Sequence, residues 1–136
     1  MKLSRTVAYA LQATLQLAQC ESAGPVPCNR LAAQGKMPER FLLQVLRNLV
    51  THGILESTRG IEGGYTLQRD PNDISLLEVI EAIDGPLTST LPIHEGLPAD
   101  SKARLEEALH EVTEAARHAL AAVKLAHLLP GPRKSR

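Results

Sequence analysis

The chain has 136 residues, a formal net charge of zero and 43% hydrophobic residues, which indicate a folded domain, with or without an appended helix. Only 2% are aromatic, so the core must consist of aliphatic side chains, which suits packed helices better than a β-sandwich. Two cysteines are too few for a typical small secreted domain, and no apolar run reaches the ~18 residues that span a membrane. We therefore expect a cytoplasmic protein that does not bind membranes.

The zero net charge hides an uneven distribution along the chain. Residues 1–70 carry eight Lys/Arg and five Asp/Glu, residues 71–101 carry six acids and no base, and residues 102–136 carry seven bases and four acids. A basic front part therefore precedes an acidic middle, and the net charge alone does not exclude a nucleic-acid partner.

The first third of the chain is predicted to form three helices. Apolar residues recur at helical spacing over residues 4–20, with Ser4 as the N-cap. A short helix follows over residues 27–35, with Gly35 at its end. A third helix begins with Pro38 at its first position and runs to Thr51, and its apolar stripe consists of Leu42, Val45, Leu46 and Leu49. The short turn between the last two helices is typical of a helix-turn-helix unit.

Residues 54–67 are predicted to form a β-hairpin. The segments "ILEST" and "YTLQ" flank the loop "RGIEGG", which is too long for a two-residue turn. A lone two-stranded hairpin is only marginally stable, so it must pack against the helices. Its position directly after the helix-turn-helix predicts the wing of a winged helix.

The second half of the chain is predicted to contain two further helices. One begins at a capping box formed by Ser75 and Glu78 and ends at Gly85. The other spans residues 100–129 and carries a heptad seam that we expect to pack against its copy in a homodimer. The seam residues are Leu105, Leu109, Val112, Ala116, Ala119, Val123 and Ala126.

The predicted fold class is therefore mostly α with a small β-hairpin, a winged helix-turn-helix with a long C-terminal helix. The expected parts are a DNA-binding domain over residues 1–87, a connecting loop over 88–99, a dimerisation helix over 100–129 and a flexible basic tail over 130–136.

Arg59 stands at the head of the glycine-rich loop of the predicted wing. Arginine is favoured in a narrow minor groove because the negative potential is enhanced there. We expect Gly60, Gly63 and Gly64 to give the backbone room for a close approach, and Tyr65 to anchor the base of the wing. The alternative is an ordinary hairpin loop with a solvated arginine.

Residues 1 to about 87 resemble the IscR/NsrR/CymR (Rrf-two) family of bacterial transcriptional regulators. The resemblance rests on "MKLSRTVAYAL", "GPVP", "FLLQVLRNLVTHGILESTRG" and "GGYTLQRDPNDISLLEVIEAIDGPL", in this order and at these spacings. It implies a dimeric winged-helix repressor that binds an imperfect palindrome, with the helix from Pro38 as the recognition helix.

Base-recognition chemistry suggests roles for side chains of the recognition helix, since the family's own site preference does not carry over to a helix with Leu43. Gln44 would read adenine, Arg40 would read guanine or bind phosphate, and Leu43, where many members have Glu, would contact a thymine methyl. Ile61 and Glu62 replace the Pro and Gly of the usual family wing. The candidate DNA-binding residues are Arg5, Arg40, Leu43, Gln44, Arg47, Asn48, Arg59, Gly60, Gly63, Gly64 and Tyr65.

Many family members carry three cysteines before the long helix, and these hold an iron–sulfur cluster. This chain has none there, and a lone loop histidine such as His94 is usually just exposed, so we expect no cluster, metal or other cofactor. Cys20 and Cys28 either form a redox pair or are two partly buried thiols, and we favour the second reading.

Three functions compete on the sequence alone. The first is a homodimeric repressor that binds double-stranded DNA and responds to a small ligand, to a protein partner or to no signal. The second, favoured by the zero net charge and Glu62, is a winged-helix protein-interaction module that has lost DNA binding. An enzyme is not expected, because no nucleophile set, nucleotide loop or paired carboxylates stand at suggestive positions.

Overall fold

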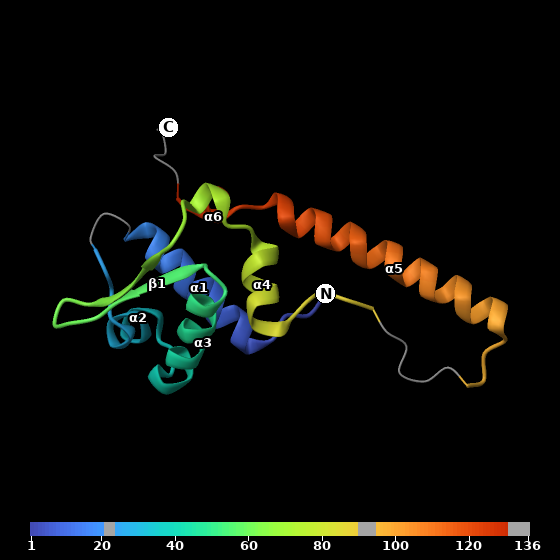
Figure 1. Cartoon of the computed structure of the whole chain (residues 1–136), viewed down its shortest axis with the longest axis horizontal. Helices are drawn as coiled ribbons and strands as arrows, with labels where there is room; N and C mark the ends of the chain where they lie inside the picture. The colour runs from blue at the N-terminus through green and yellow to red at the C-terminus, as the bar shows by residue number, and fades with distance from the viewer. Residues whose placement is uncertain (21–23, 90–94, 131–136) are drawn as a thin grey trace.

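The computed structural model describes residues 1–20, 24–89 and 95–130, and it shows a mostly helical protein with one two-stranded antiparallel hairpin (Figure 1). In chain order the elements are α1 (Arg5–Gln19), α2 (Cys28–Gly35), α3 (Glu39–Thr51), β1 (Leu55–Thr58), β2 (Gly64–Leu67), the short 3-10 helix η2 (Pro71–Asp73), α4 (Leu76–Asp84), α5 (Ala99–Ala122) and α6 (Leu125–Leu128). The hairpin and α5 extend toward opposite ends of the molecule. The predicted winged helix-turn-helix with a long C-terminal helix is confirmed.

Helix α1 forms the centre of the core and packs against α2, α3, α4, α6 and β2. Its N-cap is Ser4, as predicted, and the Ser4 hydroxyl accepts a hydrogen bond from the Val7 backbone N–H at 3.1 Å. The buried side chains around α1 are aliphatic apart from Thr14 and Ser75. The described core therefore consists mainly of Leu, Ile, Val and Ala side chains, as the low aromatic content predicted.

The turn between α2 and α3 differs in detail from the prediction. Gly35 is the last residue of α2, and the left-handed position beyond it is taken by Lys36, with a φ of 55°. A Cβ on Gly35 would lie 2.6 Å from Gln12 Nε2, and this amide donates to the Gly35 carbonyl at 2.7 Å. The glycine thus allows α1 to approach α2 closely instead of supplying the turn. Pro38 is the N-cap of α3 and not its first helical residue.

The hairpin is attached to the helical body through one residue before α2. Leu55 pairs with Leu67 at its base and Thr58 pairs with Gly64 near its tip. Val26 exchanges two backbone hydrogen bonds with Tyr65, at 3.0 and 2.9 Å, and so extends the hairpin by one paired residue. The segment containing Val26 therefore fixes the position of the wing.

Helix α4 has the predicted start and stop signals. Ser75 accepts from the Glu78 backbone N–H, and the Glu78 carboxylate accepts from the Ser75 N–H, both at 3.1 Å. Gly85 ends the helix with a φ of 83°. Ile74 and Val79 are both fully buried beside this cap.

The prediction of one helix over residues 100–129 is wrong at its C-terminal end. Helix α5 ends at Ala122, and Val123 and Lys124 are extended. The Leu76 N–H donates to the Val123 carbonyl, and the Leu125 N–H donates to the Ile74 carbonyl, both at 2.9 Å. This pairing and the full burial of Leu125 replace the helical hydrogen bonds and bring α6 back against α1 and η2.

Candidate nucleic-acid interface

Helix α3 divides its side chains between the core and the solvent. The predicted stripe of Leu42, Val45, Leu46 and Leu49 is fully buried. The opposite face carries Arg40, Gln44, Arg47, Asn48 and Thr51, all exposed, with the half-buried Leu43 at its edge. A single face of α3 is thus free to enter a groove, and it contains every recognition-helix residue that the sequence singled out.

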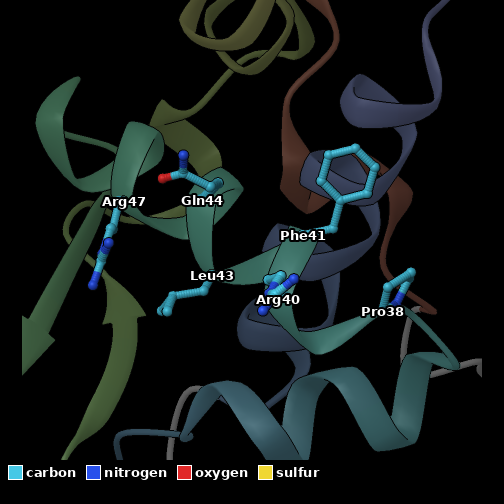
Figure 2. A pocket seen from close by; sticks show the side chains of 6 residues that line it. All are labelled: Pro38, Arg40, Phe41, Leu43, Gln44 and Arg47. Carbon is cyan, nitrogen blue, oxygen red and sulfur yellow. The ribbon is translucent and has the colours of Figure 1, made fainter.

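This face borders a hollow of about 580 Å³ that is lined by Pro38, Arg40, Phe41, Leu43, Gln44 and Arg47 (Figure 2). Leu43 and Arg47 project from α3 toward the side on which the strands lie, and Phe41 leaves the helix on the other side. The Phe41 ring is half exposed and meets the Tyr9 ring of α1 edge to face, with 6.1 Å between ring centroids. Sequence reasoning missed Phe41, although an aromatic residue inside a predicted recognition helix was a usable signal.

The wing carries its arginine near the tip. Arg59, Gly60, Ile61 and Glu62 are exposed, and the Gly63 N–H donates to the Gly60 carbonyl at 3.0 Å, which closes the turn. Gly60 has a φ of 110° and open space around its Cα, so it is free for the close approach that we expected.

Gly63 and Gly64 are required for steric reasons within the protein. A Cβ on Gly63 would lie 2.1 Å from the Thr58 carbonyl oxygen, and one on Gly64 would lie 2.4 Å from the Val26 carbonyl carbon. Gly64 also has a φ of 153°. These two glycines are required by contacts within the protein itself, whether or not DNA comes near them.

Tyr65 is paired with Ser57, next to the tip of the hairpin, and not at its base as expected. Its side chain lies near Cys28 of α2 and Arg47 of α3. Burial raises the pKa of its phenol, the Cys28 sulfur nearby raises it further, and the Arg47 guanidinium partly offsets both effects. Tyr65 therefore joins the wing to the two helices of the helix-turn-helix, in addition to its backbone bonds with Val26. Arg5 is placed elsewhere: it is exposed in the first turn of α1, next to Ser4, whose hydroxyl lies within 3.5 Å of Asp84.

A second hollow, of about 400 Å³, separates the wing tip from the start of α2. We call it the wing-tip hollow, and it is lined by Gly24, Pro25, Pro27, Arg30, Ile61, Glu62 and Gly63. Arg30 is exposed in the first turn of α2 and adds a cation beside those of α3 and the wing. The role of Arg30 could not be inferred from the spacing of residues along the sequence, because residues 30 and 61 line one hollow only in the folded chain.

Both cysteines are free and half buried, Cys20 at the end of α1 and Cys28 at the start of α2. The Cys28 thiol donates a hydrogen bond to the Glu39 carbonyl, with 3.7 Å between sulfur and oxygen. Burial, and then the Glu39 carboxylate, raise the pKa of the Cys28 thiol. Cys28 is therefore protonated at neutral pH and is a weak nucleophile.

The heptad seam of α5 is exposed only in part, because Leu109 and Ala116 are half buried. The adjoining side of α5 is held to α4 by an ion pair between Arg117 and Glu81, and the Ser89 hydroxyl bonds to Thr113. On the seam, Leu105 is 40% exposed and Val112 is 66% exposed. Val123 and Ala126, which the heptad pattern also included, lie beyond the end of α5 and do not continue this face.

Comparison with known proteins identifies the chain. Residues 3–131 match the sequence profile of Rrf2, described as an iron-dependent transcriptional regulator. The chain belongs to the Rrf2 family. The resemblance stated from the sequence is thereby confirmed, and so is the expectation of a non-enzymatic protein, since this is a family of transcriptional regulators.

Named Rrf2 relatives are similar over different lengths. A Mycobacterium tuberculosis protein provisionally named an HTH-type transcriptional regulator is 42% identical over 71% of this chain and 60% of its own length. CymR of Bacillus subtilis is 28% identical over 84% of both chains. IscR of Escherichia coli is 34% identical over 66% of this chain and 56% of its own length. The chain thus spans 60% of the length of the mycobacterial relative.

Solved structures of two Rrf2 regulators have the same fold. The structure of CymR, the global cysteine regulator of B. subtilis, superimposes with a TM-score of 0.77 at 25% identity, over 94% of this chain and 95% of that one. IscR of T. potens gives a TM-score of 0.72 at 28% identity, over 94% and 85%. No helix in the described part of this Rrf2 chain is long and apolar enough to cross a membrane.

An iron–sulfur cluster of the kind implied by the resemblance does not suit the donor set of this Rrf2 chain. Such clusters are held by cysteine thiolates, and the sequence between α4 and α5 contains none. Cys20 and Cys28 belong to α1 and α2, and the raised pKa of Cys28 disfavours the thiolate that a cluster needs. His94, the remaining candidate, lies outside the described residues.

Proposed function

We propose that the protein is a homodimeric, sequence-specific DNA-binding transcriptional repressor that works without an iron–sulfur cluster. The observation that carries this function is the exposed polar face of α3, which lies beside a wing with Arg59 near its tip. Recognition helices of this kind enter the major groove, and arginines on flanking arms or wings reach the minor groove. The Rrf2 relatives are named as transcriptional regulators, which supports the same function.

The proposed DNA contacts divide into base recognition and backbone contact. Gln44 pairs with adenine and Leu43 packs against a thymine methyl, while Arg40 reads guanine or holds a phosphate. Arg47 and Asn48 bind the DNA backbone. This surface carries cations although the whole chain has no net charge, because all six acids of residues 71–101 lie outside α3 and the wing.

The proposed dimer uses the seam of α5. Two exposed aliphatic side chains, Leu105 and Val112, stand one heptad apart on α5, and the described residues of the same chain leave both of them accessible. A dimer with two-fold symmetry presents two copies of α3, so its operator is expected to be a palindrome. Such a dimer on a promoter would block transcription, and a small ligand or a partner protein would release it.

Fluorescence anisotropy tests this function most directly. The purified protein is titrated against the DNA upstream of its own gene and against a scrambled duplex, each at several salt concentrations. A repressor is expected to bind its operator at least 10³-fold more tightly than the scrambled duplex, with an affinity that falls steeply as salt rises.

An Arg59→Ala variant sharpens this test. Loss of a minor-groove cation is expected to weaken binding most where the flanking DNA is rich in A and T, and to reduce the salt slope by about one. Arg104→Ala, which removes an exposed arginine from α5, serves as the matched control. Equal binding by the wild type and the Arg59 variant would rule out the proposed docking of the wing.

The second candidate function is a winged protein-interaction module. Its support is Glu62, which places a negative charge beside the position proposed for phosphates. Weak binding with no sequence preference in the same titration, at every salt concentration, would favour this function over the repressor.

A further inference from the structure

Ile61 occupies an unusual position for an aliphatic residue. It is fully exposed at the tip of the wing, and it is the most exposed of the large hydrophobic side chains in the described residues. Single exposed aliphatic residues are common on protein surfaces. This one, however, lies two positions from Arg59, on the part of the wing that reaches farthest from the helices (Figure 1).

The wing holds Ile61 on a fixed support. The turn is closed by the hydrogen bond from Gly63 to Gly60, and four residue pairs fix the register of the strands below it. Val26 and Tyr65 join the hairpin, close to its tip, to the segment before α2 through two further bonds. An isoleucine carried in this way is presented to a partner with little loss of conformational entropy on binding.

Ile61 borders a hollow that is lined by apolar residues and by one side chain of each charge. The wing-tip hollow, of about 400 Å³, is lined by Ile61 and by Arg30 of α2. Glu62 lines the same hollow and opposes the positive charge of Arg30. The attraction of Arg30 for phosphate is therefore partly cancelled, so apolar contact by Ile61 adds to the binding that Arg59 provides at the tip.

We propose that Ile61 acts as an apolar wedge that enters the minor groove beside Arg59 and partly unstacks one base step. Apolar side chains at such positions kink the duplex, and isoleucine is among the residues that do so. Pyrimidine–purine steps such as TA and CA unstack most easily, so the wedge selects DNA by its deformability. This inference rests on the proposed function, since it assigns a specificity-determining residue to the same DNA-binding surface.

Selection from a random duplex library tests the wedge and finds the operator sequence in the same experiment. The full-length wild type and an Ile61→Ala variant each select binding sites, and the selected pools are sequenced. The wild-type pool should contain half-sites for α3 flanked, at a fixed distance, by an enriched TA or CA step. The Ile61→Ala pool should keep the half-sites and lose the flanking step, with binding to a wild-type site weakened about 5-fold or more.

Two controls separate the wedge from charge and from stability. Glu62→Gln should bind all sites more tightly and keep the flanking step, because it removes only the repulsion from phosphates. The Ile61→Ala salt slope and melting temperature should equal those of the wild type, since the side chain contacts no phosphate and is not part of the core. End-to-end energy transfer on the selected DNA should report a smaller bend with the variant.

Each result of the selection has a definite meaning. A flanking step that persists in the Ile61→Ala pool, or that is missing from the wild-type pool, overturns the wedge and leaves the proposed repressor standing. A wild-type pool with no enriched half-site overturns the proposed function, and the wedge with it.

Discussion

Gln44 is the exposed amide at the centre of the α3 face that is proposed to read bases. Gln44→Ala is expected to lower affinity for the operator by about 1–3 kcal/mol and to relax the preference at one base pair in each half-site. Binding to a scrambled duplex should not change, because the side chain is not proposed to contact phosphate. Competition binding with singly substituted operators measures this, and Gln19→Ala at the exposed end of α1 is the control.

Gly64 illustrates a residue whose importance is structural. Gly64→Ala would place a Cβ against the Val26 backbone and force a positive φ on a residue with a side chain. We expect it to destabilise the protein by about 1–3 kcal/mol in urea unfolding. Gly60→Ala, which has open space around it, should cost less, so an equal loss in the two variants would contradict this account.

At the scale of single elements, the cap of α4 links stability to pH. Burial raises the pKa of Glu78, but hydrogen bonds from Arg69 and from the Ser75 backbone outweigh it and hold this pKa below its ordinary value. The ionised carboxylate therefore favours the folded state. Its contribution is complete above the unfolded-state pKa of 4.5 and is lost as pH falls through the lower folded-state pKa.

The corresponding measurement is urea unfolding between pH 7 and pH 3. Glu78→Gln keeps a side chain that can complete the capping box, but it removes the charge paired with Arg69 at 2.6 Å. The variant should lose less stability than the wild type as pH falls below 4.5. Glu56→Gln, on the exposed strand β1, should follow the wild type, and identical acid profiles for all three proteins would refute the role of Glu78.

Elements with local signals could be predicted from the sequence, and elements shaped by distant contacts could not. Helices α1, α3 and α4 follow from apolar spacing and from caps such as Ser4 and Ser75. The break after Ala122 has no glycine or proline to announce it, because it arises from pairing with Ile74–Leu76 far back in the chain. Helix propensity was overridden there by tertiary contacts.

The candidate site divides in the same way. The polar face of α3 and the arginine of the wing could be read from periodicity and from position after the helix-turn-helix. Arg30 could not be assigned, since Ile61, which lines the same hollow, comes from another element, and the contact of Phe41 with Tyr9 likewise arises only in the folded chain. The two glycines before Tyr65 were given a role toward DNA, although contacts with Thr58 and Val26 already account for them.

At the scale of the whole molecule, the exposed seam of α5 predicts concentration-dependent association. Val112→Asp is expected to shift the protein from dimer to monomer in sedimentation velocity, because the charge would be buried against its copy. Operator affinity should fall together with the dimer, since one half-site alone binds weakly. Glu107→Lys changes the charge on the opposite side of α5, and it should leave a dimer of wild-type stability.

The way the wing is attached has an evolutionary consequence. Its placement depends on Val26, on Tyr65 and on two glycines at which a Cβ would meet the backbone, whereas Ile61 and Glu62 are exposed among the described residues. Mutations at these two outer positions are expected to change the free energy of unfolding very little. They can therefore accumulate and change which DNA sequences the wing binds. A gene duplicate could therefore diverge toward different promoters through the tip of its wing, long before its recognition helix changes.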